Sequence, residues 1–84
     1  MGVAVLKKQL KVKNLDIPEN DEDVIYFNRF ITNYPCDTPI DIYYYTCFKN
    51  LTVIRLKETD VYGDIADLKS LPNLTVIDLY STDV

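Results

Sequence analysis

The side chains of this sequence that could do chemistry are two cysteines and a group of carboxylates. Cys36 and Cys47 lie eleven residues apart and could form a disulfide, remain as two buried thiols, or supply half of a metal site. Zinc is not expected, because the chain has no histidine and no third cysteine to complete a tetrahedral set of ligands. No leader peptide is recognisable, so we expect a reducing compartment and two thiols, with a disulfide as the alternative.

The carboxylates do not form a catalytic arrangement. Five of them lie in one polar segment, where they should stay solvated, whereas a general acid or base needs a perturbed pKa. These five are Asp16, Glu19, Asp21, Glu22 and Asp23. No nucleophile has a histidine to pair with, and two glycines are too few for a phosphate-binding loop. We therefore expect no enzymatic activity, no cofactor and no metal.

The composition is that of one small, mildly acidic domain. Of its 84 residues, 48% are hydrophobic, which is typical of globular proteins, and 13 acidic residues outnumber 9 basic ones. The acidic balance argues against a nucleic-acid partner, since such binders carry a basic stripe. The apolar stretch at residues 3–6 is too short for a signal peptide or a membrane span. We expect a cytoplasmic protein without a membrane partner, or a secreted one if a leader has been removed.

An internal repeat is the most informative feature of the chain. Residues 48–61 read FKNLTVIRLKETDV and residues 71–84 read LPNLTVIDLYSTDV, which agree at nine of fourteen positions at an offset of 23. A period of this length is typical of solenoids, in which each unit buries its apolar side against the next. Within the period, L-x-x-I-x-L predicts a strand, and I-x-x-L-x-x-L predicts a short 3₁₀ or helical segment after a turn at Gly63.

The repeat resembles that of the leucine-rich-repeat family, in its long plant and bacterial form. The family pattern L-x-x-L-x-L-x-x-N-x-L is matched by Leu51, Ile54, Leu56, Thr59 and Val61, and again by Leu74, Ile77, Leu79, Thr82 and Val84. Its continuation is matched by Gly63, Ile65, Leu68 and Leu71. Threonine replaces the usual asparagine, and its hydroxyl makes only part of the asparagine's hydrogen bonds. The resemblance covers residues 48–84 and implies an α/β solenoid with a parallel sheet.

The first 47 residues are predicted to cap this solenoid. Residues 9–13 alternate polar and apolar, which indicates an edge strand. The apolar side chains between residues 24 and 34 have helical spacing, so a helix is predicted to end before Pro35. Residues 40–45 are rich in β-forming types and predict a strand. The predicted organisation is a strand-helix-strand cap over residues 1–47, followed by one complete and one partial repeat over residues 48–84.

The last apolar residues of the second copy are predicted to be uncovered. Leu74, Ile77 and Leu79 have no following coil in the sequence, and their strand leaves an open edge that invites pairing. Such stacks normally need at least about three repeats. Two explanations stay open. Either the chain is a fragment or a truncated gene product, or the open end is closed by self-association. Both explanations predict a homo-oligomer through the open C-terminal edge.

The resemblance implies a protein-interaction module that binds an unidentified protein on its concave sheet. The side chains between the strand leucines are Val53, Arg55, Lys57, Glu58, Val76, Asp78, Tyr80 and Ser81. The offset places Arg55 beside Asp78, so one interpretation is a solvated surface with a single weak ion pair. The other is a partner surface anchored by Tyr80 and Arg55, which are residue types that dominate interfaces.

Three consecutive tyrosines, residues 43–45, form the densest aromatic cluster. Strand alternation sends Tyr44 to one side and Tyr43 and Tyr45 to the other. Packing in the core or cap is one interpretation, and in the other Tyr43 and Tyr45 extend the concave binding surface. Two other functions compete with the interaction module. One is a structural capping piece of a longer leucine-rich-repeat protein without binding of its own, and the other is a small acidic inhibitor.

Overall fold

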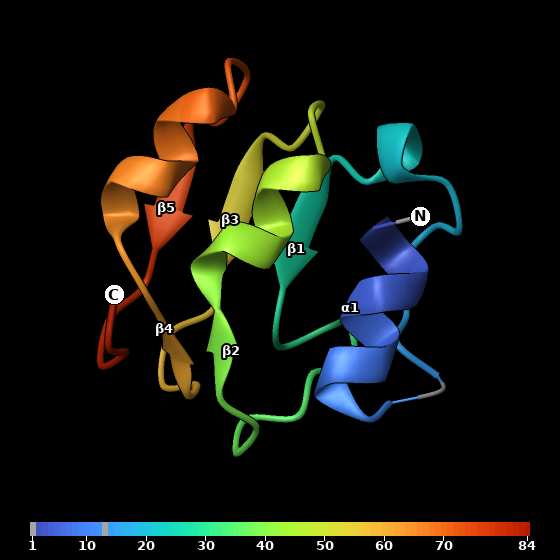
Figure 1. The fold of residues 1–84 in the computed structure, drawn as a ribbon, viewed down its shortest axis with the longest axis vertical. Helices are drawn as coiled ribbons and strands as arrows, with labels where there is room; N and C mark the ends of the chain where they lie inside the picture. The colour runs from blue at the N-terminus through green and yellow to red at the C-terminus, as the bar shows by residue number, and fades with distance from the viewer. Residues whose placement is uncertain (1, 13) are drawn as a thin grey trace.

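The strands form two parallel sheets on different sides of the molecule (Figure 1). The larger sheet has the order β1-β3-β5, with the bounds Tyr26–Asn28, Val53–Arg55 and Val76–Asp78. The smaller sheet pairs β2 (Ile40–Asp41) with β4 (Val61–Tyr62). These elements are taken from a computed structural model, which describes residues 2–12 and 14–84. The chain is therefore a mixed helix and strand fold with parallel sheets.

The register of the larger sheet reproduces the internal repeat and adds a third strand to it. Val53 pairs with Val76 and Arg55 with Asp78, which is the offset of 23 residues seen in the sequence. On the other side of β3, Tyr26 pairs with Val53, which lies 27 positions further along the chain. β1 therefore occupies the place of an earlier copy whose spacing is longer by four residues.

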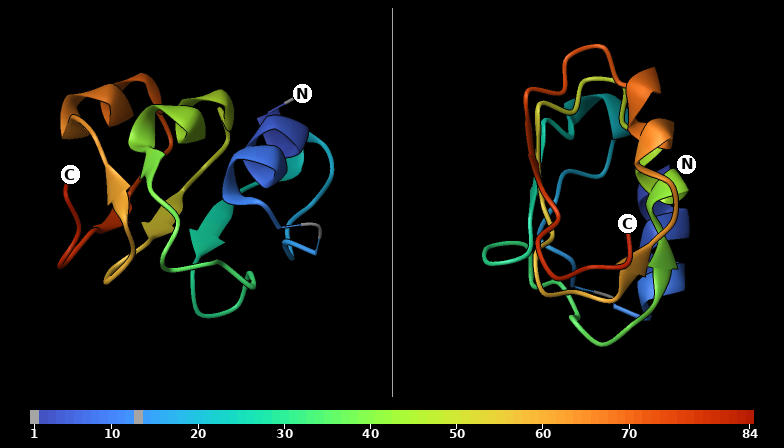
Figure 2. Two further views of the ribbon diagram at one scale, coloured as in Figure 1. Left: turned by 60° about the horizontal axis from the view of Figure 1, so that its bottom comes forward. Right: turned by 90° about the vertical axis from the view of Figure 1, so that its left-hand side faces the viewer.

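Helical segments form a layer opposite the larger sheet (Figure 2). This layer consists of α1 (Gly2–Leu10), η2 (Ile42–Cys47) and η3 (Ile65–Ser70), while a short η1 (Asp21–Asp23) precedes β1. The two longer 3₁₀ helices begin in the same way, because a carboxylate accepts a hydrogen bond from the backbone N–H two residues further on. Asp41 accepts from Tyr43 at 3.0 Å and Asp64 accepts from Ala66 at 2.9 Å. These caps are again 23 residues apart.

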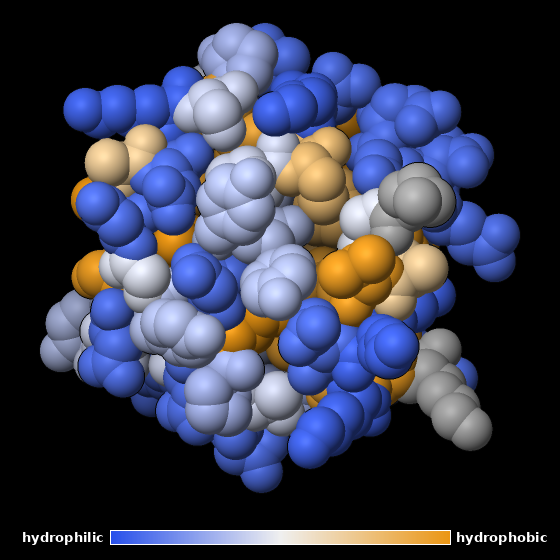
Figure 3. Space-filling model, viewed as in Figure 1, coloured by the Kyte–Doolittle hydropathy of each residue, from blue (hydrophilic) through white to orange (hydrophobic). Residues whose placement is uncertain are grey.

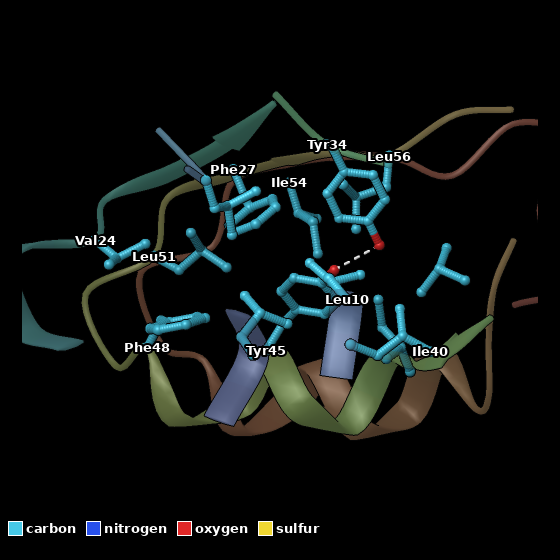
Figure 4. Packing of buried hydrophobic residues seen from close by; sticks show 14 of the residues in the cluster. Leu10, Val24, Phe27, Tyr34, Ile40, Tyr45, Phe48, Leu51, Ile54 and Leu56 are labelled. Atoms are coloured by element: carbon cyan, nitrogen blue, oxygen red, sulfur yellow. Dashed lines mark hydrogen bonds between the residues drawn. The ribbon is translucent and has the colours of Figure 1, made fainter. Parts of the chain in front are cut away.

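The core lies between the larger sheet and the helical layer, and Phe27 contacts three other aromatic rings in it (Figure 4). The ring centroid of Phe27 lies 4.9 Å from that of Tyr45 and 5.7 Å from that of Tyr34, both edge to face. Phe48 stacks on Phe27 at 6.4 Å. The hydroxyl groups of Tyr34 and Tyr45 are hydrogen-bonded at 2.7 Å. Edge-to-face packing is a favourable arrangement of aromatic rings, so this cluster ties η2 to β1 and to the loop that follows β1.

The predicted helix over residues 24–34 is wrong, since this segment forms β1 and a turn. Val24, Phe27 and Tyr34 are buried, but Ile31, which the helical spacing places on the same face, is 54% exposed. Residues 24–27 are Val-Ile-Tyr-Phe, which favour strands, and pairing with β3 satisfies their backbone groups. The spacing of the apolar residues in this segment fits a helix and also the strand that begins a repeat. The pairing of β1 with β3 decides for the strand.

The predicted strand-helix-strand order of the first 47 residues is also wrong. Instead of an edge strand at residues 9–13, the chain forms α1, and residue 13 lies outside the described residues. Val3, Leu6 and Leu10 lie on one face of α1 and are buried, so amphipathic helix packing decides the structure. The predicted strand at residues 40–45 is confirmed only for Ile40–Asp41, because η2 begins at Ile42.

The N-terminal end of α1 is held by the carboxylate of Asp21, which lies in η1. One of its oxygens accepts a hydrogen bond from the backbone N–H of Gly2 at 2.9 Å, and the other accepts from Val3 at 3.0 Å. The first N–H groups of a helix have no partner within the helix, and a carboxylate also suits the positive end of the helix dipole. The hydrogen bond from Gly2 is the main reason why the pKa of Asp21 is lowered from 3.8.

We expect Asp21→Ala to lower the free energy of unfolding by about 1 kcal/mol near pH 7, because it removes this cap. Since the pKa of Asp21 is lower in the folded chain, its contribution is present above pH 3.8 and is lost as the pH falls below that value. Urea unfolding of the wild type and the variant at pH 7 and pH 3 measures both effects. Asp16→Ala is the matched control, because Asp16 is exposed. An equal loss in both variants would contradict the capping role.

No helix of the described residues is long and apolar enough to cross a membrane.

Candidate functional site

The outward side of the larger sheet carries the side chains that the repeat pattern predicts to be functional. Side chains alternate along each strand, so the middle residue points to the core and its two neighbours point outward. Two cross-strand rows result, with neighbouring strands about 4.8 Å apart. The first row is Tyr26, Val53 and Val76, and the second is Asn28, Arg55 and Asp78. We call these six residues, with Phe30, Lys57 and Tyr80 beyond the strand ends, the outer sheet face.

The predicted cross-strand pair on this face is confirmed. A guanidinium nitrogen of Arg55 lies 4.0 Å from a carboxylate oxygen of Asp78, and the two side chains are 44% and 29% exposed. A pair this long and this exposed contributes at most about 1 kcal/mol to stability. The pair therefore orients two polar groups at the surface and does little to hold the fold together.

Phe30, an exposed phenylalanine close to two cationic side chains, lies just after the end of β1. The loop after β1 projects outward from the sheet (Figure 2, right), and Phe30 in this loop is 57% exposed. The guanidinium carbon of Arg29 lies 4.4 Å from the centre of the Phe30 ring, and the ammonium of Lys57 lies 5.4 Å from it. Both distances are within the range of cation–π attraction. The ring is therefore oriented at the surface although it is largely open to solvent.

The loop that carries Phe30 is held by hydrogen bonds to Asn28. The side-chain oxygen of Asn28 accepts from the backbone N–H of Phe30 at 2.9 Å, and its backbone carbonyl accepts from the hydroxyl of Thr32 at 2.8 Å. Thr32 is fully buried. A polar residue of the outer sheet face thus fixes the loop, and a buried threonine anchors it to the core.

Charge is distributed unevenly between the outer sheet face and the rest of the chain. Arg29, Arg55 and Lys57 are three of the nine basic residues, whereas Asp78 and the adjoining Glu58 are only two of the thirteen acidic ones. The area around Phe30 is therefore slightly positive on a chain whose net charge is −4. Such an area attracts a negatively charged partner.

Most residues predicted for the concave surface lie on this face or at its border. Val53, Arg55, Val76 and Asp78 belong to the strands. Lys57 and Tyr80 follow them, and Tyr80 is 73% exposed. The backbones at Glu58 and Ser81 have φ angles of 61° and 58°, so these two residues form left-handed turns at the end of the face.

The interpretation of Tyr43 and Tyr45 as parts of the binding surface is wrong. Tyr45 is completely buried in the aromatic core. Tyr43 is 64% exposed but belongs to η2, in the layer opposite the larger sheet (Figure 2). Residues 42–47 form a 3₁₀ helix with three residues per turn, so Ile42 and Tyr45 share the inward side. The alternative interpretation, core packing, is confirmed for Tyr45.

Sequence reasoning missed the side chains that β1 contributes, namely Tyr26, Asn28 and Phe30. A signal was present in the sequence. Val24, Phe27 and Thr32 have the same mutual spacing as Leu51, Ile54 and Thr59. Arg29 occupies the position equivalent to Leu56, which weakened the apolar pattern and hid this earlier copy.

A second concave surface, between α1 and η2, contains one of the two free cysteines. The helical layer seen in Figure 3 is largely polar, with apolar side chains exposed between these two elements. A groove of about 360 Å³ is present there, lined by Val5, Tyr43, Tyr44 and Cys47 among others. The thiol of Cys47 donates to the carbonyl of Tyr44 at 3.2 Å, and burial raises its pKa. A raised pKa keeps the thiol protonated near pH 7 and makes it a weaker nucleophile. Cys36 is also free, as expected.

Comparison of the chain with protein-family models, with curated proteins and with solved structures gives no significant match.

Proposed function

We propose that this chain is a non-enzymatic protein-interaction module, built as a short leucine-rich-repeat solenoid, that binds an acidic protein segment on its outer sheet face. The observation that carries the proposal is the exposed Phe30 ring between Arg29 and Lys57, on the same face as the exposed Tyr80. Aromatic and arginine side chains dominate the energetics of protein interfaces. The slight positive charge of the face favours a partner that presents carboxylates next to an apolar side chain.

The solenoid part of the proposal is supported by hydrogen bonds that recur with the repeat. The hydroxyl of Thr59 donates to the carbonyl of Leu56 at 2.7 Å, and that of Thr82 donates to Leu79 at 2.7 Å. Each hydroxyl also accepts from the backbone N–H two residues further on, at 3.5 and 3.4 Å. These threonines stand where the family has asparagine, and they bind the adjacent turn in part of the way that asparagine does. Together with the strand register and the two aspartate caps, these threonine hydrogen bonds give the two copies a similar local structure.

Selection from a peptide-display library on the immobilised full chain tests the proposed binding. We expect the selected peptides to be enriched in Asp or Glu next to an aromatic or aliphatic residue. Tyr80→Ala and Phe30→Ala should each weaken binding of a selected peptide by at least about tenfold, since both remove exposed aromatic area from the proposed binding face. Isothermal titration calorimetry gives the affinities, and circular dichroism checks that the variants fold.

Tyr43→Ala is the matched control for Tyr80→Ala, because Tyr43 is similarly exposed but lies on the opposite layer. Its affinity for the peptide should equal that of the wild type. Equal losses in Tyr43→Ala and Tyr80→Ala, or peptides without acidic enrichment, would contradict the proposal.

A second candidate function is that of a structural piece in a longer leucine-rich-repeat stack, without binding of its own. The observation that favours it is the exposed apolar end of the fold, where Ile77 is 46% and Ile65 53% exposed. This candidate predicts that the same selection yields no peptide that depends on Tyr80 or Phe30. The two functions are therefore separated by one experiment.

A further inference from the structure

The end of the fold formed by β5 and η3 is apolar and open. It lies opposite α1 (Figure 1) and contains a shallow groove of about 440 Å³. Five apolar side chains line most of this groove, and we call them the apolar end: Ile65, Leu68, Leu71, Leu74 and Ile77. Ile77 is 46% exposed, while its register partners Ile54 and Phe27 are completely buried. The core residue of the last strand is thus left half-covered.

The strand at this end also presents an unpaired edge, since β5 is the last strand of the β1-β3-β5 order. The backbone N–H of Val76 donates to Thr52, and the carbonyl of Asp78 accepts from Leu56, so these groups point toward β3. Backbone groups of successive strand residues point to opposite sides, so the N–H and C=O of Ile77 point to the open side. Such an edge pairs readily with a further strand.

We propose that a second copy of this chain covers the apolar end, with the two β5 strands paired antiparallel about a two-fold axis at Ile77. In an antiparallel pair, two residues that face each other directly can exchange both backbone hydrogen bonds. The two Ile77 residues do so in this arrangement. Their side chains stay on the inward side, and the two larger sheets join into one sheet of six strands. The apolar side chains of both copies then form one continuous core.

A two-fold pair fits this molecule better than head-to-tail stacking, because its two ends differ. At the opposite end, α1 buries Leu6 and Leu10, and Phe27 of the first strand is inaccessible. The outward face of α1 and the residue after it carry Lys7, Lys8 and Lys11, so that end is a poor match for the apolar end of another copy. A surface that pairs only with itself gives a closed dimer and no filament.

The area of the apolar end is sufficient for a weak, specific dimer. The molecule measures 28 Å along the vertical axis of Figure 1 and 19 Å along the viewing axis, and these two dimensions bound the end. These dimensions limit the area that each copy can cover to roughly 500 Å², and that of the pair to roughly 1,000 Å² in total, which is the lower limit for a specific interface. We expect a dissociation constant on the order of micromolar.

Sedimentation velocity of the full chain between about 1 and 200 µM should show a reversible equilibrium of monomer and dimer. Ile77→Lys should be folded and monomeric over this range, since the lysine places a charge against its own symmetry mate. If that variant fails to fold, Ile65→Lys makes the same test from η3. Tyr80→Ala is the control and should remain dimeric, because Tyr80 lies on the outer sheet face. A monomer at every concentration, or a series of larger oligomers, would overturn the proposed dimer.

A cysteine at the two-fold axis tests the geometry directly. Directly opposed residues that exchange hydrogen bonds have Cα atoms about 5.5 Å apart, which suits a disulfide. In a background with Cys36→Ser and Cys47→Ser, Ile77→Cys should form a covalent dimer under mild oxidation, whereas Tyr80→Cys should not. A non-covalent dimer in which Ile77→Cys does not cross-link would refute the two-fold at Ile77. If the monomeric Ile77→Lys variant still selects binding peptides, the proposed binding function does not depend on dimerisation.

Discussion

Phe27→Ala should lower the free energy of unfolding by about 3–5 kcal/mol, the largest effect of any single substitution that we predict. A chain of this size has a total stability of roughly 4–12 kcal/mol, so this variant should be mostly unfolded at mild denaturant concentrations. The physical reason is the position of Phe27 in the aromatic cluster, in contact with three other rings from the loop after β1 and from η2 and its C-cap. Removing the ring leaves a cavity that these neighbours cannot close.

The sheet register supplies two matched controls for this substitution. Phe27, Ile54 and Ile77 occupy equivalent inward positions on β1, β3 and β5. Ile54→Ala should cost about 2–5 kcal/mol, because Ile54 is completely buried. Ile77→Ala should cost less than about 1.5 kcal/mol in the monomer, since its side chain is already 46% exposed. The predicted loss of stability therefore increases from Ile77 through Ile54 to Phe27, that is, with distance from the apolar end.

Urea unfolding followed by circular dichroism measures this series at several protein concentrations, and extrapolation to the dilute limit gives the stability of the monomer. Equal midpoints for Ile54→Ala and Ile77→Ala would show that the apolar end is covered even in the monomer. A small effect of Phe27→Ala would show that the aromatic cluster is not the centre of the core.

The half-covered end was predictable from the sequence, whereas the structure of the first 47 residues was not. The copies at residues 48–61 and 71–84 are regular, so the register, the turn at Gly63 and the exposure of Ile77 follow from their period. The earlier copy has four additional residues, and Arg29 stands at one of its apolar positions. The remaining apolar side chains then have helical spacing. Only the pairing of β1 with β3, a contact distant in sequence, decides between the two structures.

The candidate site was predicted in part for the same reason. Arg55 and Asp78 belong to the regular copies, and their pairing is confirmed. Phe30 belongs to the irregular copy, and its contact with Lys57 follows only from the pairing of β1 with β3, which the sequence pattern did not reveal. The irregular copy that escaped the sequence pattern thus carries the most distinctive feature of the outer sheet face.

The same irregular region brings Tyr34 into a buried hydrogen bond with Tyr45, and this pair should make the fold sensitive to alkali. Burial raises the pKa of Tyr34 to about 12 and that of Tyr45 well above its ordinary value of 10.0. In the unfolded chain both tyrosines lose their protons near pH 10, so the unfolded state is favoured as the pH rises further. The stability that the neutral pair provides is therefore complete below pH 10 and is lost between pH 10 and about 12.

Tyr45→Phe should lower the free energy of unfolding at pH 7 by about 1–3 kcal/mol, because it leaves the Tyr34 hydroxyl buried without its partner. The double variant Tyr34→Phe/Tyr45→Phe should lose less than the sum of the two single variants, since no unsatisfied hydroxyl remains. It should also keep its circular dichroism signal to a higher pH than the wild type. Tyr80→Phe, at an exposed position, should leave the stability at pH 7 unchanged. Additive losses in the double variant would show that the two hydroxyls do not depend on each other. The loop after β1 would then be held to η2 by ring packing alone.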